Sequence, residues 1–237
     1  MKPIRLDPTL KALSVLLSYP SDALKEALPE IRGILAAEKR LSERTRKAIL
    51  ALLDHLETGD IWDLQAEYVE LFDRSRSLSL NLFEHVHGES RERGGAMVEL
   101  LEIYRRGGFD LKGVELPDHL PVLLEYLATR PPGEMREMLG DAAHILEALR
   151  QRLERRSSRY AAVFAALTEL ADARPSAKAL EPLLAVPDED PNDLEAIDAA
   201  WEETEVVFGP DPGAGCPEVR KMLARIDTAS PAPAKPH

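Results

Sequence analysis

Apolar residues recur at spacings of three and four over the first 72 residues, in four runs that each follow a residue suited to the start of a helix. Residues at these spacings share one face of an α-helix, and Ser or Asp side chains can accept hydrogen bonds from its first free backbone amides. The starting residues are Asp7 with Pro8, Ser21, Ser42 and Asp60. The pattern therefore predicts amphipathic helices over residues 8–17, 21–35, 42–59 and 60–72, joined by short loops.

The same spacing continues beyond residue 90. It predicts a helix over residues 90–107 that ends at two glycines, and another that begins just after Pro117. After a break at residues 131–133, we expect one long helix carrying residues 138–153 and a second carrying residues 160–170.

Residues 77–83 alternate polar and apolar side chains, which is also typical of a β-strand. A single strand has no pairing partner elsewhere in the sequence, and an unpaired strand is not stable. We therefore expect a helix here, buried on most sides because its leucines surround the helix axis.

The amino-acid composition changes near residue 176, where prolines and glycines become frequent. We expect an all-helical domain over residues 1–175, an acidic segment with one or two helices over residues 176–226, and a disordered tail over residues 227–237. Within the acidic segment, amphipathic spacing predicts helices over residues 192–207 and 219–226.

The composition supports a helical fold. The chain has 37 Leu against 20 Val and Ile together, and only 5% aromatic residues. Leucine favours helices, whereas β-branched and aromatic residues favour strands. The predicted class is therefore all-α, a single compact helical bundle with a flexible C-terminal tail.

The single cysteine, Cys216, excludes a disulfide within the chain and a cysteine-based metal cluster. Charged residues interrupt the apolar N-terminal region, so neither an export signal nor a membrane span is predicted. These features predict a cytoplasmic protein with no transmembrane segment.

The negative charge of the chain is concentrated in one region. Residues 179–219 contain 12 acidic side chains and no Lys or Arg, which equals the net charge of −12 of the whole protein. The rest of the chain is neutral and lacks a basic field that would bind phosphates, so nucleic-acid binding is not expected. The acidic stretch would suit a basic partner, or it would act only as a solvated surface.

The common catalytic motifs are absent, but two groups of polar residues can be considered for chemistry. His85 and His87 stand beside Glu84 and Glu89, and Asp118 is followed directly by His119. Two residues two positions apart on a helix point about 200° from each other, which disfavours a shared metal ion. Asp118 is expected just inside a helix start, where it would either cap the helix or act with His119.

A resemblance to a known family is carried by three blocks. They read Glu67-Tyr-Val-Glu-Leu-Phe-Asp-Arg74, Leu82-Phe-Glu-His-Val-His-Gly-Glu-Ser-Arg-Glu-Arg-Gly-Gly-Ala-Met-Val98, and Glu115-Leu-Pro-Asp-His-Leu-Pro121 followed by Leu124-Glu-Tyr-Leu127. In order and spacing these blocks resemble the NarJ family of nitrate reductase molybdenum cofactor assembly chaperones, within the wider redox-enzyme maturation proteins. The similarity extends over most of the chain.

The resemblance implies an all-helical chaperone that is not an enzyme and holds no stable cofactor of its own, although it acts on a molybdenum-cofactor enzyme. The implied partner is the catalytic (alpha) subunit of respiratory nitrate reductase, bound partly through its N-terminal peptide before membrane docking. Cofactor-insertion proteins are further candidate partners. The alternative function is a helical metal-dependent hydrolase using His85, His87, Asp118 and His119.

The candidate residues for binding the partner peptide follow from the motifs. The family's shared residues fall here on Tyr68, Leu71, Phe72, Pro117, Asp118 and His119. Acidic side chains such as Glu84, Asp118 and Glu125 would read basic residues on the peptide, and His85, His87 and Tyr126 complete the predicted site. Because Tyr68, Leu71 and Phe72 lie at i, i+3 and i+4, Leu71 and Phe72 are also expected to belong to the core.

Overall fold

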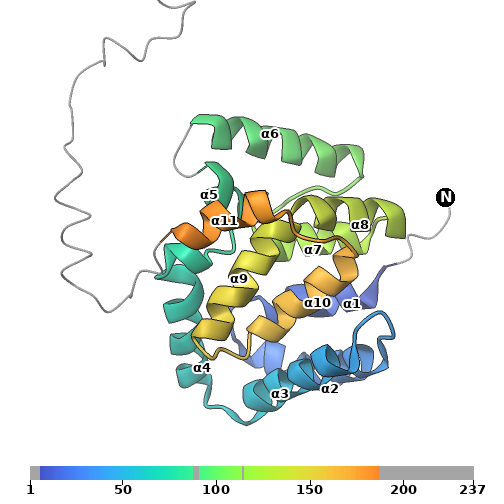
Figure 1. The fold of residues 1–237 in the computed structure, drawn as a ribbon. Helices are drawn as coiled ribbons and strands as arrows, with labels where there is room; N and C mark the ends of the chain where they lie inside the picture. Colours follow the sequence, from blue (N-terminus) through green and yellow to red (C-terminus); the bar gives the residue numbers. More distant parts are fainter. Residues whose placement is uncertain (1–5, 88–90, 114, 187–237) are drawn as a thin grey trace, which may run out of the picture. The chain divides into compact units, whose positions relative to one another are not determined.

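The computed structural model describes residues 6–87, 91–113 and 115–186, all within the first of two units of the chain, Met1–Asp193 (Figure 1). No strand occurs in this part of the protein, and the predicted all-α class is confirmed. The helices are α1 (Pro8–Leu16), α2 (Asp22–Ala37), α3 (Glu43–Thr58), α4 (Ile61–Tyr68), α5 (Leu82–His87), α6 (Arg91–Arg106), α7 (Leu120–Ala128), α8 (Pro132–Asp141), α9 (Ala143–Arg155), α10 (Ala161–Ala171) and α11 (Ala177–Ala185). A π-helical turn, Val69–Asp73, and a 3-10 turn, Arg76–Leu78, connect α4 to α5.

The first four helices begin at the residues that the sequence indicates. Asp7 accepts hydrogen bonds from the amides of the first turn of α1, and Ser21, Ser42 and Asp60 do the same for α2, α3 and α4. These caps satisfy backbone donors that have no partner inside the helix, and each stabilises its helix by about 1 kcal/mol. The predicted helix starts are therefore confirmed.

Helix α10 lies at the centre of the packing. It contacts α3, α8 and α9, while α1 packs against α2 and α7 (Figure 1). Most of its residues are buried apolar side chains, including Phe164 and Leu167, which are not exposed at all. Each such side chain contributes roughly 1.5–3 kcal/mol by leaving water, so the leucine-rich core supplies the main stabilisation of the bundle.

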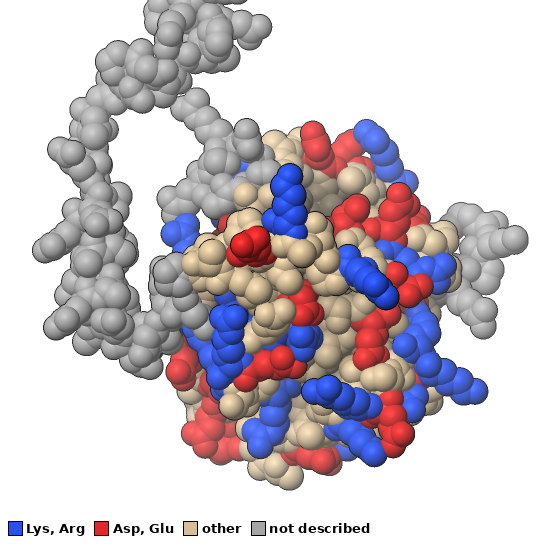
Figure 2. Space-filling model, in the orientation of Figure 1, with Lys and Arg blue, Asp and Glu red and all other residues tan. Residues whose placement is uncertain are grey.

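The surface in view carries Lys and Arg interspersed with Asp and Glu, without a large area of one sign (Figure 2). This agrees with the neutral balance of charge outside residues 179–219. Such alternating charges act mainly to keep the protein in solution and contribute little to stability pair by pair.

The helix predicted over residues 77–83 is wrong. The 3-10 turn ends at Leu78, the chain is then extended, and α5 begins only at Leu82. Asn81 forms an isolated antiparallel bridge with His119, so the extended segment does have a pairing partner, in the turn before α7. The leucines at 78, 80 and 82 are all buried, which explains why their alternation resembles that of a strand.

The single long helix predicted to carry residues 138–153 is divided in two. Helix α8 ends at Asp141 and α9 begins at Ala143, with Ala142 as the capping residue between them. Both helices bury apolar residues of the predicted pattern, Leu139 in α8 and Leu149 in α9. Periodicity alone does not register such a break because the apolar spacing continues across it.

Helix α6 is at one edge of the described structure, apart from the central helices (Figure 1). Its start and end agree with the predicted helix over residues 90–107. Leu100 and Tyr104 are buried, whereas Val98 is 66% exposed and Ile103 is 39% exposed. Only a narrow face of α6 therefore contributes to the core.

Helix α11 packs on α9, although none of its side chains is fully buried. The guanidinium of Arg152, a residue that is 2% exposed, donates to the carbonyl oxygens of Leu183 at 2.6 Å and Val186 at 3.2 Å. It also donates to the carbonyl oxygen of Ser77 at 2.6 Å. A cation at the C-terminal carbonyls of a helix is favourable, so Arg152 connects α11 to the bundle.

The predicted boundary at residue 175 stays a prediction. The helices predicted over residues 192–207 and 219–226 and the predicted tail over residues 227–237 lie outside the described residues. Within the described part, none of the helices is both long and apolar enough to cross a membrane.

We expect Arg152→Met to lower the free energy of unfolding by about 3 kcal/mol, because it removes the donor to three carbonyl oxygens, of which that of Ser77 is buried. Urea unfolding followed by circular dichroism measures this change. Arg155→Met is the matched control, since Arg155 is an exposed residue of the same helix. Equal stability of the two variants would contradict the role given to Arg152.

Candidate functional site

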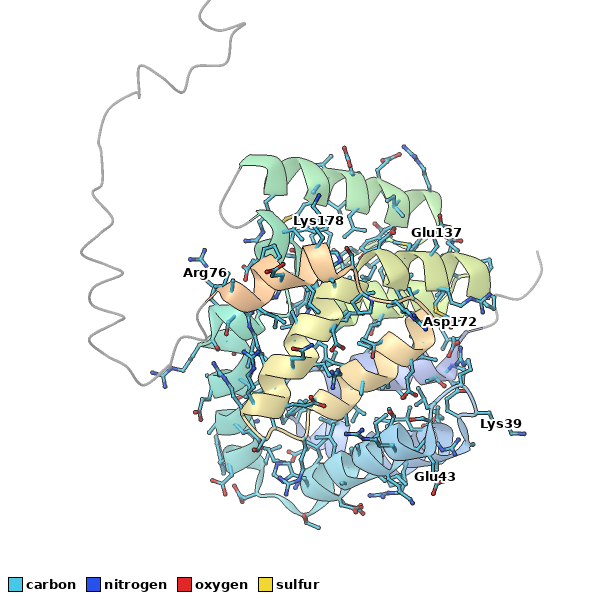
Figure 3. All side chains as sticks on the ribbon, in the orientation of Figure 1. Lys39, Glu43, Arg76, Glu137, Asp172 and Lys178 are labelled. Carbon is cyan, nitrogen blue, oxygen red and sulfur yellow. The ribbon has the colours of Figure 1, made fainter. Side chains whose placement is uncertain are left out.

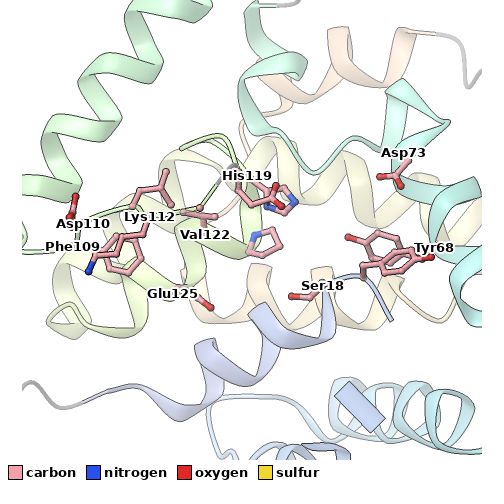
Figure 4. Close-up of a pocket in the computed structure, with 14 residues that line it drawn as sticks. Ser18, Tyr68, Asp73, Phe109, Asp110, Lys112, His119, Val122 and Glu125 are labelled. Atoms are coloured by element: carbon pink, nitrogen blue, oxygen red, sulfur yellow. The ribbon is translucent and has the colours of Figure 1, made fainter. Parts of the chain in front are cut away.

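A groove of about 750 Å³ opens where four segments of the chain meet (Figure 4). These segments are the residues after α1, the end of α4 with the π-helical turn, the loop between α6 and α7, and the first turns of α7. The lining residues are Ser18, Tyr19, Tyr68, Asp73, Phe109, Asp110, Leu111, Lys112, Gly113, Glu115, His119, Pro121, Val122 and Glu125. The groove thus brings together Tyr68 and His119, one from each of two sequence motifs.

Aromatic side chains make the walls of the groove rigid. The ring of Tyr19 lies edge-on to the ring of Tyr68, with centroids 5.6 Å apart, and Tyr19 remains 49% exposed. The hydroxyl of Tyr68 donates to the carbonyl oxygen of Leu17 at 2.8 Å, which fixes the ring. On the other side, Phe109 packs edge-on against Tyr104 at 5.6 Å. Such rigid aromatic walls favour an apolar ligand, because the site does not have to rearrange when the ligand binds.

The groove is acidic. Asp73, Asp110 and Glu115 line it and have no Lys or Arg partner within the described part of the chain. Glu125 is different, because it forms an ion pair with Lys11. Lys112 is the one Lys or Arg among the lining residues, so a basic group on a ligand would find uncompensated carboxylates here.

His119 lies between these acidic and aromatic groups, with Tyr68 and Asp73 on one side and the loop residues Phe109 to Lys112 on the other (Figure 4). Its Nδ1 is 3.6 Å from a carboxylate oxygen of Glu115 and has no hydrogen-bond partner among the described residues. Burial lowers the pKa of His119, although the nearby carboxylates of Glu115, Asp118 and Asp73 oppose this shift. Because Nδ1 is itself buried, a ligand in the groove meets the His119 ring through its exposed part, which is 20% of the side chain.

Asp118 does not lie where the sequence predicts it. It precedes α7 by two residues, and His119 occupies the N-cap position without a side-chain hydrogen bond. The carboxylate of Asp118 is 0% exposed and accepts a hydrogen bond from the backbone amide of Phe83 at 3.1 Å. Asp118 therefore caps the start of α5, a different helix from the one expected.

Burial raises the pKa of the Asp118 carboxyl, while the amide of Phe83 and the guanidinium of Arg93 act against that shift. Arg93 lies on α6, with its Nη2 3.8 Å from Asp118 Oδ2 and 3.0 Å from Glu84 Oε1. One guanidinium is thus shared between two carboxylates from separate segments. Three acidic residues are predicted to bind a basic peptide: Glu84, Asp118 and Glu125. Each of them already forms an ion pair or a hydrogen bond with another residue of the chain.

The segment with His85 and His87 faces a different place. Glu84 and His85 line a small pocket of about 180 Å³ together with Arg152 and the end of α11. His85 Nε2 is 2.8 Å from the carbonyl oxygen of Ser79, and burial lowers the pKa of His85. His87 is the last residue of α5, and its side chain lies outside what the structure describes.

Three of the predicted peptide-binding residues line the groove: Tyr68, His119 and Glu125. Leu71 and Phe72, at 7% and 5% exposure, belong to the core, as the alternative interpretation has it. Tyr126 is 1% exposed, and Pro117 is buried with its carbonyl oxygen accepting from Tyr104. These residues support the groove from behind.

The sequence motifs do not indicate that residues 109–113, Glu115, Asp73 and Tyr19 belong to the site. The loop carries Asp110, Lys112 and Glu115 between two helices, but its composition does not show which surface it faces. Loops frequently carry binding residues on a helical scaffold, and this is the signal that could have indicated it.

His85 and His119, which the hydrolase hypothesis combines, line separate pockets. Within the described residues, no three side chains of His, Cys, Asp or Glu come together in an arrangement that could hold a metal ion.

Comparison with known proteins gives consistent results for sequence and structure. Residues 38–166 match the family model of the nitrate reductase delta subunit. The nitrate reductase molybdenum cofactor assembly chaperone NarJ of Escherichia coli (strain K12) is 48% identical over 208 residues, which cover 87% of both chains. NarW of the same strain is 37% identical over 207 residues, covering 87% of this chain and 86% of NarW.

The chain belongs to the nitrate reductase delta subunit family. A crystal structure from Archaeoglobus fulgidus, described as a redox enzyme maturation protein, is also similar, with a TM-score of 0.51 and 25% identity. The matching region covers 69% of this chain and 91% of the Archaeoglobus fulgidus chain. The part matching the family model includes every segment of the groove except the residues that follow α1.

Two partly buried histidines, His85 and His119, predict how stability changes with acid. Because the folded-state pKa of His85 and of His119 is lowered, the unfolded chain binds protons more readily below its own histidine pKa of about 6.5. Stability is therefore lost as the pH falls through that value, by at most about 1.4 kcal/mol per pH unit for each histidine.

We expect a His85→Gln/His119→Gln variant to lose less stability than the wild type between pH 7.5 and 5.5, as measured by urea unfolding. The contributions of the other titrating groups cancel in the difference between the two proteins. The same pH dependence in both proteins would show that these histidines are not protected from protonation.

Proposed function

We propose that this member of the nitrate reductase delta subunit family is an assembly chaperone for respiratory nitrate reductase. It binds the apo catalytic (alpha) subunit through that subunit's N-terminal segment and holds it for insertion of the molybdenum cofactor before membrane docking. In this role it acts in the cytoplasm, catalyses no reaction and holds no cofactor stably. Proteins that insert the cofactor would be further partners.

The observation that carries the proposal is the groove between α1, α4 and α7. It combines exposed and rigid aromatic surface with carboxylates that have no Lys or Arg partner in the described part of the chain. A peptide that forms an amphipathic helix binds such a groove with its apolar face, and charges at the rim set its orientation. The groove fits a segment that carries both apolar and basic side chains.

The relatives support the identity of the partner. The E. coli protein NarJ, 48% identical to this chain, is named for the assembly of the nitrate reductase molybdenum cofactor. The groove residues Tyr68 and His119 lie in the blocks that resemble this family. The alternative, a metal-dependent hydrolase, has no comparable support, since two of its proposed residues, His85 and His119, line different pockets.

We expect the purified protein to bind a synthetic peptide with the N-terminal sequence of the catalytic subunit, with a negative heat-capacity change because apolar surface is buried. Isothermal titration calorimetry at several temperatures measures both quantities. Absence of binding by this peptide and by the full apo-subunit at tens of micromolar would contradict the proposed function.

The acidic groups of the groove give a second prediction. We expect Asp73→Asn/Glu115→Gln to weaken peptide binding about tenfold and to reduce its dependence on salt, because attraction to basic side chains is lost. The control is Glu137→Gln, which removes a charge from the exposed surface of α8 (Figure 3), and Glu137 does not line the groove. The same loss in the control would point to a general effect of net charge instead of a local contact.

The aromatic wall gives a third prediction. Tyr19→Ala should weaken the same peptide by about tenfold without lowering the melting temperature by more than a few degrees, because a half-exposed ring contributes more to a ligand than to the core. Trp62→Ala is the matched control, since Trp62 is 76% exposed and does not line the groove. Affinities measured by calorimetry should separate the two variants, and unchanged affinity of Tyr19→Ala would remove this wall from the site.

A further inference from the structure

We infer that Asp118 is a positioning residue, which holds His119 in the groove from behind and connects the groove to α5 and α6. This inference rests on the proposed peptide-binding function for its effect on affinity, but the contacts themselves lie within the free protein. It differs from the expectation that Asp118 contacts the peptide. With 0% exposure, the carboxylate of Asp118 is out of reach of a ligand in this structure.

The backbone on both sides of His119 is held by the segment that leads into α5. The amide of Leu82 donates to the carbonyl oxygen of Asp118 at 3.0 Å, and the amide of Leu120 donates to the carbonyl oxygen of Leu80 at 2.8 Å. The Asp118 side chain adds the hydrogen bond from the amide of Phe83. One face of this turn is therefore fixed against α5, while His119 points from the turn into the groove.

Helix α6 is attached to the same turn at two points. Arg93 pairs with Glu84 and lies 3.8 Å from Asp118, and the hydroxyl of Tyr104 donates to the carbonyl oxygen of Pro117 at 2.7 Å. The side chains of Arg93 and Glu84 are only 18% and 22% exposed. Ion pairs with so little exposure to water are only weakly screened by salt. Removing one partner lowers stability strongly, because the other charge stays buried without a counter-charge.

These contacts couple the groove to α6, although no residue of α6 lines the groove. A change at Arg93 alters the environment of Asp118, and through it the turn that carries His119. If the position of α6 affects the affinity of the groove, a peptide in the groove must affect α6 to the same extent. Arg93 does not line the groove, so an effect of Arg93 on peptide binding that exceeds the effect of removing an exposed charge from α6 is transmitted through these contacts.

The test compares Asp118→Asn, Arg93→Met and the double variant in full-length protein. Asn keeps an oxygen for the amide of Phe83 and removes only the charge, while Met keeps the length of the Arg93 side chain. The matched control is Arg106→Met, which removes an exposed guanidinium from the same helix, where it pairs with Glu102. A further variant, Arg93→Lys, keeps the positive charge.

Two quantities are measured for each variant. The first is the affinity for the N-terminal peptide of the catalytic subunit, and the second is the NMR signal of the His119 ring in the free protein. We expect Asp118→Asn and Arg93→Met each to lower the affinity about tenfold, with the double variant close to either single one, because both remove the Arg93–Asp118 interaction next to the turn that carries His119. Both should shift the His119 signal, Arg93→Lys should restore part of it, and Arg106→Met should change neither quantity.

Additive losses in the double variant, or an Arg93→Met protein with unchanged affinity and an unchanged His119 signal, would overturn the inference and favour direct contact of Asp118 with the peptide. Failure of the wild type to bind the peptide would contradict the proposed function alone. In that case the His119 signal of the free variants still decides whether Asp118 positions the turn. Arg93→Met also provides this answer if Asp118→Asn does not fold.

Discussion

A carboxylate that is fully withdrawn from water depends on hydrogen bonds and a counter-charge inside the protein, and Asp118 draws these from two other segments through Oδ2, while its Oδ1 is buried without a hydrogen-bond partner among the described residues. Its backbone and side-chain oxygens accept from the amides of Leu82 and Phe83, so α5 has to begin there. Arg93 of α6 offers the nearby positive charge, 3.8 Å from Asp118 Oδ2, which requires α6 to contact α5. The turn before α7, the extended residues before α5 and the edge helix are therefore one structural unit.

Most carboxylates that line the groove, in contrast, have no basic partner within the described part of the chain. Glu84, Glu125 and Asp118 are compensated by Arg93, Lys11 and backbone amides, while Asp73, Asp110 and Glu115 lack such partners within the described residues. These three carboxylates are exposed to solvent, so they are accessible to a basic group on a ligand. Uncompensated carboxylates beside exposed aromatic rings are thus a better indication of a binding surface than acidic residues counted along the sequence.

The helices of the bundle could be predicted from the sequence because their causes are local. The caps at Asp7, Ser21, Ser42 and Asp60 and the apolar spacing of three and four are properties of short segments, and the structure confirms them. The extended residues before α5 could not be predicted, since their partner is a turn far along the chain. The same limit applies to the site. The motifs indicate Tyr68 and His119, which line the groove, but periodicity does not show whether an acidic side chain faces Arg93, an amide or solvent.

The two kinds of interaction have different effects on the fold. Burial of leucine is not directional, and a bundle of leucine-rich helices could shift or rotate with little change in buried area. The polar contacts of Asp118, Arg93 and Tyr104 have fixed distances and directions, so they are satisfied in one arrangement of α5, α6 and α7. A chaperone that recognises one partner needs a groove of constant shape, and the core alone does not provide it. In this protein the leucines supply the stability, and the buried polar network behind His119 supplies the position of the groove wall.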